Sequence, residues 1–191
     1  MPLLGIDAYH GDSGLSFHDL AQNGVVFCFL KCSQGARGTD PAYRGYYDRA
    51  KSVGLTTGAY HFFTEDDPIQ QAHHFLKAAD LKSGDLVHAL DVETLFGDVG
   101  ARAKACAEEI KDQTGRWPII YSGDSFFQDN LVSEFLPADF TLWIARYSSQ
   151  KPQTPCVFWQ FSDHGAYPAN PPLDTSHFFG TLKELQAHCI Q

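Results

Sequence analysis

The chain has 191 residues and an ordinary hydrophobic share of 43%, so it is long enough for one domain with a sizeable core. Its formal net charge of −9 argues against nucleic acid as a partner, because phosphate binding needs clustered Lys and Arg. No apolar run approaches the roughly 20 residues that span a bilayer, so we expect no membrane insertion.

The first residues, Met1 to Asp7, lack the basic and long apolar regions of a secretory signal, which leaves the localisation unknown. The five cysteines form an odd set without a C-x-x-C pair, and most stand among apolar residues. Free buried thiols are therefore expected, with one disulfide as the open alternative.

Helix signals divide the first two thirds of the chain. Asp40-Pro41 and Asp67-Pro68 each combine an N-cap acceptor with a proline at the first helical position. Apolar residues at three- and four-residue steps follow both pairs, and a third such stripe runs from Val99 to Ile110. Gly54 and Gly115 mark helix ends.

Short apolar runs lie between these helices and are typical of strands buried on both faces. They cover residues 3–6, 25–30, 57–63, 86–92 and 118–121. Strands that alternate with helices predict parallel pairing through right-handed crossovers, and five such units fill roughly the first 135 residues.

The spacing changes after the fifth unit. Residues 140–145 and 157–161 resemble strands, an apolar patch follows at 173–179, and only the last stretch, 182–190, is amphipathic. We therefore predict an irregular TIM-like α/β barrel, five β/α units followed by three strands with few helices, over residues 1–191 as a single domain. The alternative, an open doubly wound sheet, lacks a phosphate-binding glycine loop after its first strand.

Active sites of such barrels lie at the C-terminal ends of the strands. Several acidic and polar residues follow the predicted strands, and carboxylates that converge on one rim raise one another's pKa. The residues at these ends are Asp7, Lys31, Tyr60, His61, Asp91, Glu93, Tyr121, Arg146, Gln160 and Asp174.

The most specific unit among them is Leu90-Asp91-Val92-Glu93. Residues two apart on a strand face the same way, so both carboxylates are expected to enter one space while Val92 packs behind them. The alternative is that one carboxylate caps the next helix, although the next apolar stripe begins only near Val99.

Eight short blocks between about Gly5 and Gly180 resemble, in order and spacing, the glycoside hydrolase family 25 lysozymes (muramidases). The blocks are GID at 5–7, KCSQG at 31–35, GAYHF at 58–62, LDVE at 90–93, PIIY at 118–121, LWIA at 142–145, WQF at 159–161 and LD at 173–174. The resemblance implies a barrel of this kind and hydrolysis of the β-1,4 bond between N-acetylmuramic acid and N-acetylglucosamine in bacterial peptidoglycan.

Carried over by position, the family's acid/base falls on Glu93, and its other active-site carboxylates fall on Asp7, Asp91 and Asp174. The chain departs from the family pattern twice. Ser33-Gln34 stands where Thr-Glu is usual, and Asp174-Thr175-Ser176 stands where Asp-x-Asn is usual. The second departure bears on the role of Asp174.

Glu93 is expected to act as proton donor and then as base, with the substrate's 2-acetamido group as nucleophile and Asp91 orienting that group, giving net retention. Asp7 and Asp174 are expected to support the site or, alternatively, to make ordinary hydrogen bonds at the rim. The expected substrate-binding residues are Tyr60, His61, Tyr121, Arg146, Trp159 and Gln160, with Trp143 as a further stacking or core residue.

Two other classes of protein compete with this interpretation. His10 and His61 together with the acids could form a metal-dependent polysaccharide hydrolase or deacetylase, although their spacing matches no compact metal motif. An inactive sugar-binding barrel would keep the cleft without turnover. We expect a monomer that binds a peptidoglycan glycan strand and needs neither metal nor cofactor.

Overall fold

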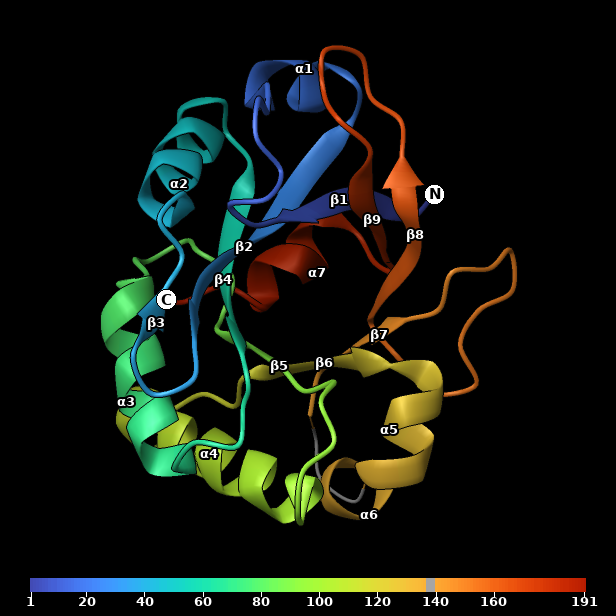
Figure 1. The fold of residues 1–191 in the computed structure, drawn as a ribbon. Helices are drawn as coiled ribbons and strands as arrows, with labels where there is room; N and C mark the ends of the chain where they lie inside the picture. Colours follow the sequence, from blue (N-terminus) through green and yellow to red (C-terminus); the bar gives the residue numbers. More distant parts are fainter. Residues whose placement is uncertain (137–139) are drawn as a thin grey trace.

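The computed structural model describes residues 1–136 and 140–191, which form an eight-stranded closed barrel with a further short strand outside it (Figure 1). The strands are β1 (Leu3–Ala8), β2 (Val25–Gln34), β3 (Gly38–Thr39), β4 (Thr56–Phe62), β5 (Ala89–Asp91), β6 (Ile119–Gly123), β7 (Leu142–Ala145), β8 (Phe158–Gly165) and β9 (Leu173–Phe178). The helices are α1 (Phe17–Gln22), α2 (Tyr43–Ser52), α3 (Pro68–Ala79), α4 (Val99–Thr114), α5 (Asp124–Asn130), α6 (Val132–Phe135) and α7 (Leu182–Ala187).

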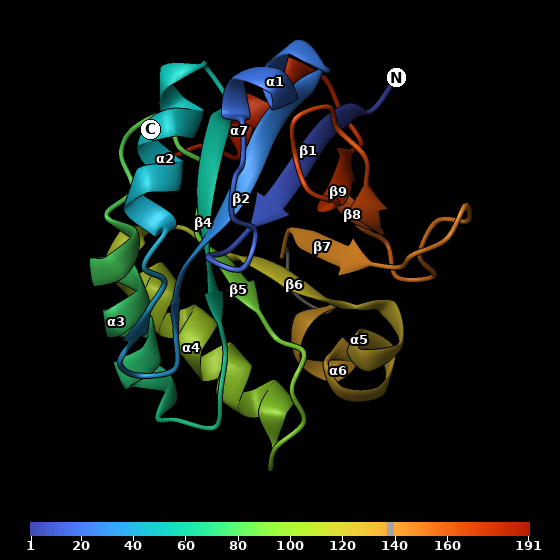
Figure 2. The same cartoon turned by 45° about the horizontal axis from the view of Figure 1, so that its top comes forward.

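The strand pairing confirms the predicted irregular barrel. Strands β1, β2, β4, β5, β6, β7 and β8 pair in parallel in that order. Strand β9 then pairs antiparallel with both β8 and β1 and closes the ring, while β3 pairs only with β2 on the outside. Helices α1 to α6 lie outside the strands, and no described helix separates β7, β8 and β9 (Figure 2).

Local sequence signals explain most helix boundaries. Asp67 caps α3, accepting from the backbone N–H of Gln70 at 2.9 Å, and α4 ends at Gly115 in the left-handed conformation, both as predicted. The predicted start of α2, with Asp40 as the N-cap, was wrong. Ala42 is the N-cap, while Asp40 accepts from the Ala42 N–H at 2.9 Å and holds the preceding turn.

The barrel interior is filled by aromatic rings from alternate strand positions. Phe29 stacks on Trp143 with ring centres 4.6 Å apart, and Phe27 packs edge-on against Phe158. Two glycines make room for these rings, since a side chain at Gly5 would overlap the Phe27 ring and one at Gly58 the Phe29 ring. These glycines therefore serve close packing.

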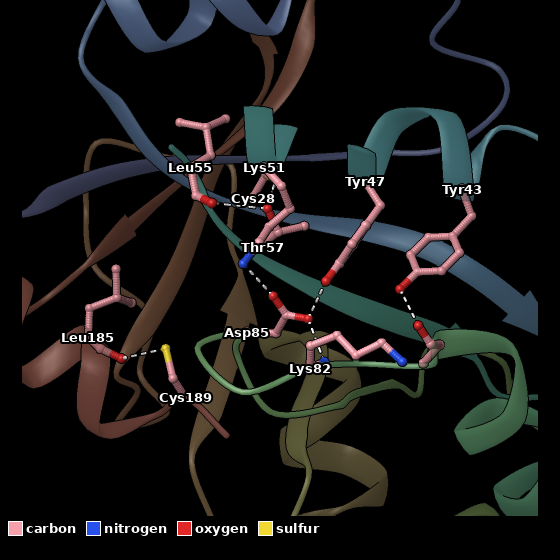
Figure 3. A network of polar contacts seen from close by, with 11 residues as sticks. Cys28, Tyr43, Tyr47, Lys51, Leu55, Thr57, Lys82, Asp85, Leu185 and Cys189 are labelled. Atoms are coloured by element: carbon pink, nitrogen blue, oxygen red, sulfur yellow. Dashed lines mark hydrogen bonds and ion pairs between the residues drawn. The ribbon is translucent and has the colours of Figure 1, made fainter. Parts of the chain in front are cut away.

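Helix α7 lies across the end of the barrel where the parallel strands begin (Figure 1), with Leu185 buried against the inner rings. Asp85 lies at this end and is fully buried. Its carboxylate accepts from Lys51 Nζ at 2.6 Å, the Tyr47 hydroxyl at 2.6 Å and the Lys82 backbone N–H at 2.7 Å (Figure 3). A satisfied polar network thus joins α2 to the loop before β5.

All five cysteines belong to the described residues and are free, and four of them are buried, which confirms the free-thiol interpretation. Within residues 1–136 and 140–191, none of the helices has the length and apolar character required to cross a bilayer.

Candidate active site

The opposite end of the barrel, where the parallel strands terminate, contains a pocket of about 220 Å³. Its wall combines carboxylates with aromatic side chains from seven strands or the residues that follow them. The lining residues are Asp7, Tyr9, Lys31, Tyr60, Phe62, Asp91, Glu93, Tyr121, Trp143, Tyr147 and Asp174.

Strand alternation brings all four predicted carboxylates into this pocket. Asp91 is the last residue of β5 and Glu93 follows two positions later, while Val92 between them is fully buried. The Val92 N–H donates to the Tyr121 carbonyl at 2.9 Å, which continues the pairing with β6 beyond the end of β5. Asp7 on β1 stands directly opposite Asp174 on the antiparallel β9.

Asp91 and Glu93 differ in exposure. Asp91 is 5% exposed, and its Oδ1 is buried without a hydrogen-bond partner, so burial and then the Glu93 charge raise the Asp91 pKa well above its ordinary value. Glu93 lies at the exposed mouth, where neighbouring atoms still exclude enough water to raise its pKa. Lys31 acts against both shifts, because its ammonium favours the ionised acids.

Asp7 takes part in a hydrogen-bonded group centred on Gln160. The amide nitrogen of Gln160 donates to Asp7 Oδ2 at 2.8 Å, and its oxygen accepts from the hydroxyls of Tyr121 at 2.8 Å and Tyr147 at 3.1 Å. Burial and the charge of Asp174 raise the Asp7 pKa well above its usual range. The pocket therefore combines two deeply buried acids with an accessible one whose proton is retained to a higher pH than that of an ordinary glutamate.

Comparisons with known proteins identify the family. A sequence model of the Glycosyl hydrolases family 25 matches residues 6–169. The chain belongs to this family.

Among curated relatives, the autolytic lysozyme of Clostridium acetobutylicum is 32% identical over 85% of the chain. The match spans only 51% of that relative's length. The muramidase from Trichobolus zukalii, whose structure is known, is 26% identical, with a TM-score of 0.89 over 98% of each chain. The bacterial lysozyme from Streptomyces coelicolor, at 22% identity, has the same fold, with a TM-score of 0.91 over 99% of this chain and 97% of that one.

Four predicted binding residues of the family 25 chain lie outside the pocket lining, namely His61, Arg146, Trp159 and Gln160, the last of which contacts Asp7, Tyr121 and Tyr147 from behind the wall. His61 is fully buried on the outer side of β4, where its ring contacts Ser33 Oγ at 2.8 Å and Gln71 Oε1 at 3.3 Å. Trp159 also faces away from the barrel interior, and its indole N–H donates to the Arg146 carbonyl at 2.9 Å.

Arg146 lines a separate, wider hollow of about 610 Å³ beside α5, where it pairs with Asp124 at 3.3 Å. Asp124 also accepts from the backbone of Gln153 and Thr154, which holds the loop between β7 and β8. This hollow is larger than the carboxylate pocket, but among the described residues only two acids line it, Asp124 and Asp129, and Asp124 is paired with Arg146. The carboxylate pocket therefore remains the better candidate for acid/base chemistry.

Several residues of the pocket are not among the binding residues predicted from the sequence. Tyr9 and Tyr147, with 43% and 54% of their surface exposed, are the accessible aromatic side chains of the wall. Lys31 is predicted from the sequence to lie at the end of a strand, without a binding role. Its Nζ lies 4.7 Å from the ring centre of Phe62. Tyr147 follows Trp143 and Ala145 at two-residue steps, so the alternation that identified Glu93 also predicts Tyr147.

The alternative metal site is not assembled among the described residues. His10 Nδ1 contacts Asp40 at 2.7 Å, away from the pocket lining, and His61 is enclosed by Ser33 and Gln71. Across residues 1–136 and 140–191, no three His, Cys, Asp or Glu side chains are grouped as metal ligands.

Proposed function

We propose that this protein is a lysozyme, an N-acetylmuramidase that hydrolyses the β-1,4 bond between N-acetylmuramic acid and N-acetylglucosamine in peptidoglycan. The observation that carries the proposal is the pairing of the accessible Glu93 with the buried Asp91 in one pocket. The names of the relatives, an autolytic lysozyme and a muramidase, support the same substrate. The partner is a glycan strand lying across the open end of the barrel.

Glu93 is the proton donor in this proposal. A general acid must hold its proton near the working pH, and the pKa of Glu93 is raised by its partly enclosed position. It gives its proton to the glycosidic oxygen as the bond from that oxygen to the anomeric carbon breaks. Glu93 then accepts a proton from water in the second step.

The nucleophile is the oxygen of the substrate's own 2-acetamido group, which bonds to the anomeric carbon and forms a cyclic cation. The Asp91 carboxylate lines the pocket and its Oδ1 lacks a protein partner, so this group is available to accept the acetamide N–H and to stabilise the positive charge that develops. Water then attacks the anomeric carbon from the side of the departed sugar. Two displacements give net retention.

Aromatic side chains complete the proposed sugar site. Tyr60 and Tyr121 line the inner wall, while Tyr9 and Tyr147 offer accessible ring faces at the rim. Aromatic rings pack well against the apolar faces of sugar rings. Gln160 lies behind this wall, holding Tyr121 and Tyr147 through its amide oxygen, and contributes indirectly.

Product analysis on purified peptidoglycan tests the proposal. Fragments are reduced with borohydride and their ends are identified by mass spectrometry, and we expect reduced N-acetylmuramic acid. Reduced N-acetylglucosamine would contradict the assigned bond. Binding without fragments would indicate a sugar-binding barrel, and chelator-sensitive acetate release without chain cleavage would indicate a deacetylase.

A further inference from the structure

The orientation of the Gln160 side-chain amide is fixed by its surroundings. Gln160 is 1% exposed, and its oxygen receives two phenolic hydroxyls, from Tyr121 and Tyr147. An amide oxygen only accepts, so the amide nitrogen is directed at Asp7 Oδ2, 2.8 Å away. The reverse orientation would put the amide oxygen against a carboxylate oxygen. Asp7 Oδ2 is thereby committed as an acceptor.

The other side of Asp7 meets a second acid. Asp174 is its direct partner in the β1–β9 register, and both carboxyl groups line the same pocket. A hydrogen bond between them requires a proton on one of them, because two carboxylates offer only acceptors. Asp7 is 7% exposed, and no described Lys, Arg or His lies within salt-bridge distance of it or of Asp174.

We propose that Asp7 and Asp174 hold one proton between them, that the Gln160 amide keeps this proton off Asp7 Oδ2, and that the pair presents one negative charge to the sugar. Only the effect of this shared proton on catalysis rests on the proposed function; the shared proton itself does not. The proton is taken from solvent and lies on the oxygens that face each other. Gln160 is therefore a positioning residue, acting through Asp7.

The shared proton has a consequence for the chemistry. When the pair shares a proton, it contributes one negative charge to the pocket that it lines together with Glu93, Asp91 and Lys31. A fully ionised pair would add a second negative charge facing Glu93, which would hold the Glu93 proton more tightly and hinder its transfer. Sharing one proton thus limits the negative electrostatic potential at Glu93. The one charge that remains on the pair still favours the positive charge that develops on the sugar.

Other charged groups face the pair and must be considered in any titration. They are Asp12 after β1, Lys31 on β2, Asp91 and Glu93 at β5, and Asp163 and His164 on β8. Of these, Asp12 and Asp163 add negative charge, and His164 opposes them when protonated. Burial raises the pKa of both Tyr60 and Tyr121, so these phenols stay neutral donors.

Carbon-13 NMR titration of the aspartate carboxyl carbons tests the proposal, in a Glu93→Gln background that removes the nearest glutamate. We expect the Asp7 and Asp174 signals to move together in two steps, one of them above the ordinary aspartate range. Asp174→Asn should convert the Asp7 signal to one step. Independent single steps for both residues, or an Asp7 titration unchanged by Asp174→Asn, would overturn the inference.

Two further variants test the role of Gln160. Gln160→Met removes the amide donor at similar volume, and we expect the upper step of the pair to move to higher pH. Tyr147→Phe removes one hydroxyl but leaves Tyr121 to orient the amide, and it should move the same step less. If the upper step stays unchanged in Gln160→Met, Gln160 has no positioning role. The control for unrelated charge changes is Asp48→Asn, because Asp48 is an exposed residue on α2. These measurements need no turnover, so their outcome is independent of whether peptidoglycan is the substrate.

Discussion

Asp85 and Asp91 lie at opposite ends of one barrel and are both buried, but their surroundings differ. Asp85 accepts three hydrogen bonds, one of them from a lysine, whereas Asp91 keeps an oxygen without a partner. Burial of a charged group is unfavourable unless partners compensate it. The end covered by α7 thus stabilises the fold. The open end contains a buried acid without compensating partners, which lowers the stability but leaves the acid available for reaction.

The largest effect is expected for the open end, in Glu93→Gln. Removal of the transferable proton should lower kcat by about 10²–10⁴-fold, the usual contribution of general acid catalysis. The measurement is release of soluble fragments from labelled peptidoglycan. Glu108→Gln, an exposed glutamate of α4, is the matched control and should keep full activity. Near-normal turnover by Glu93→Gln would contradict the assignment of Glu93 as the proton donor.

Asp91→Asn should separate activity from stability. Loss of the charge that faces the developing cation should lower kcat by about 10²-fold. The pKa of Asp91 is raised in the folded state, so the folded protein binds more protons than the unfolded chain, and its stability falls as the pH rises from the unfolded pKa towards the folded one. Asp91→Asn does not lose this stability, because asparagine does not ionise.

We therefore expect the unfolding temperature of Asp91→Asn to exceed that of the wild type by roughly 2–4 °C at pH 7 for a gain of about 1 kcal/mol. The gain should disappear near pH 4, where the wild-type carboxyl is protonated. Calorimetry at both pH values measures it. A lower unfolding temperature at pH 7 would mean that Asp91 stabilises the fold.

Asp85→Asn should give the opposite result at the covered end. The variant leaves Lys51 without its carboxylate and weakens the bond to Tyr47, and we expect a loss of roughly 2 kcal/mol, moderated because Lys51 is partly exposed. Denaturant unfolding gives the loss, with Asp48→Asn as control. Activity per folded molecule should stay unchanged, and a fall in kcat would show that the two ends are coupled.

The smallest effect is expected for Lys31→Met. Lys31 lowers the pKa of Glu93, so its removal should raise that pKa further. A general acid loses activity as the pH rises through its pKa, and the alkaline limb of the kcat profile should move upward. A limb that stays in place would exclude Glu93 as the group that titrates there.

Much of this arrangement follows from two-residue alternation along strands. The rule predicts that Asp91 and Glu93 enter the same space, and the eight sequence blocks predict the order of the site residues around the barrel. The same rule also explains which candidates fall outside the pocket. His61, Arg146 and Trp159 each lie one position from an inward-facing residue, so they point to the outer side.

Other features could not be obtained from the sequence. The start of α2 shifted because Asp40 satisfies a turn rather than the helix itself. The contact between Asp7 and Asp174 depends on the register of β9 against β1, which no local pattern specifies across more than 160 residues of chain. The Gln160 network likewise needs three side chains from separate strands or loops.

The pairing of β9 with β1 has a bearing on how the protein is made. Strand β1 must wait until β9 has been synthesised before the ring can close, and contacts of such sequence separation slow folding. Asp7 meets Asp174 only at that moment. A nascent chain is consequently unable to assemble the complete set of acids until β9 has been synthesised.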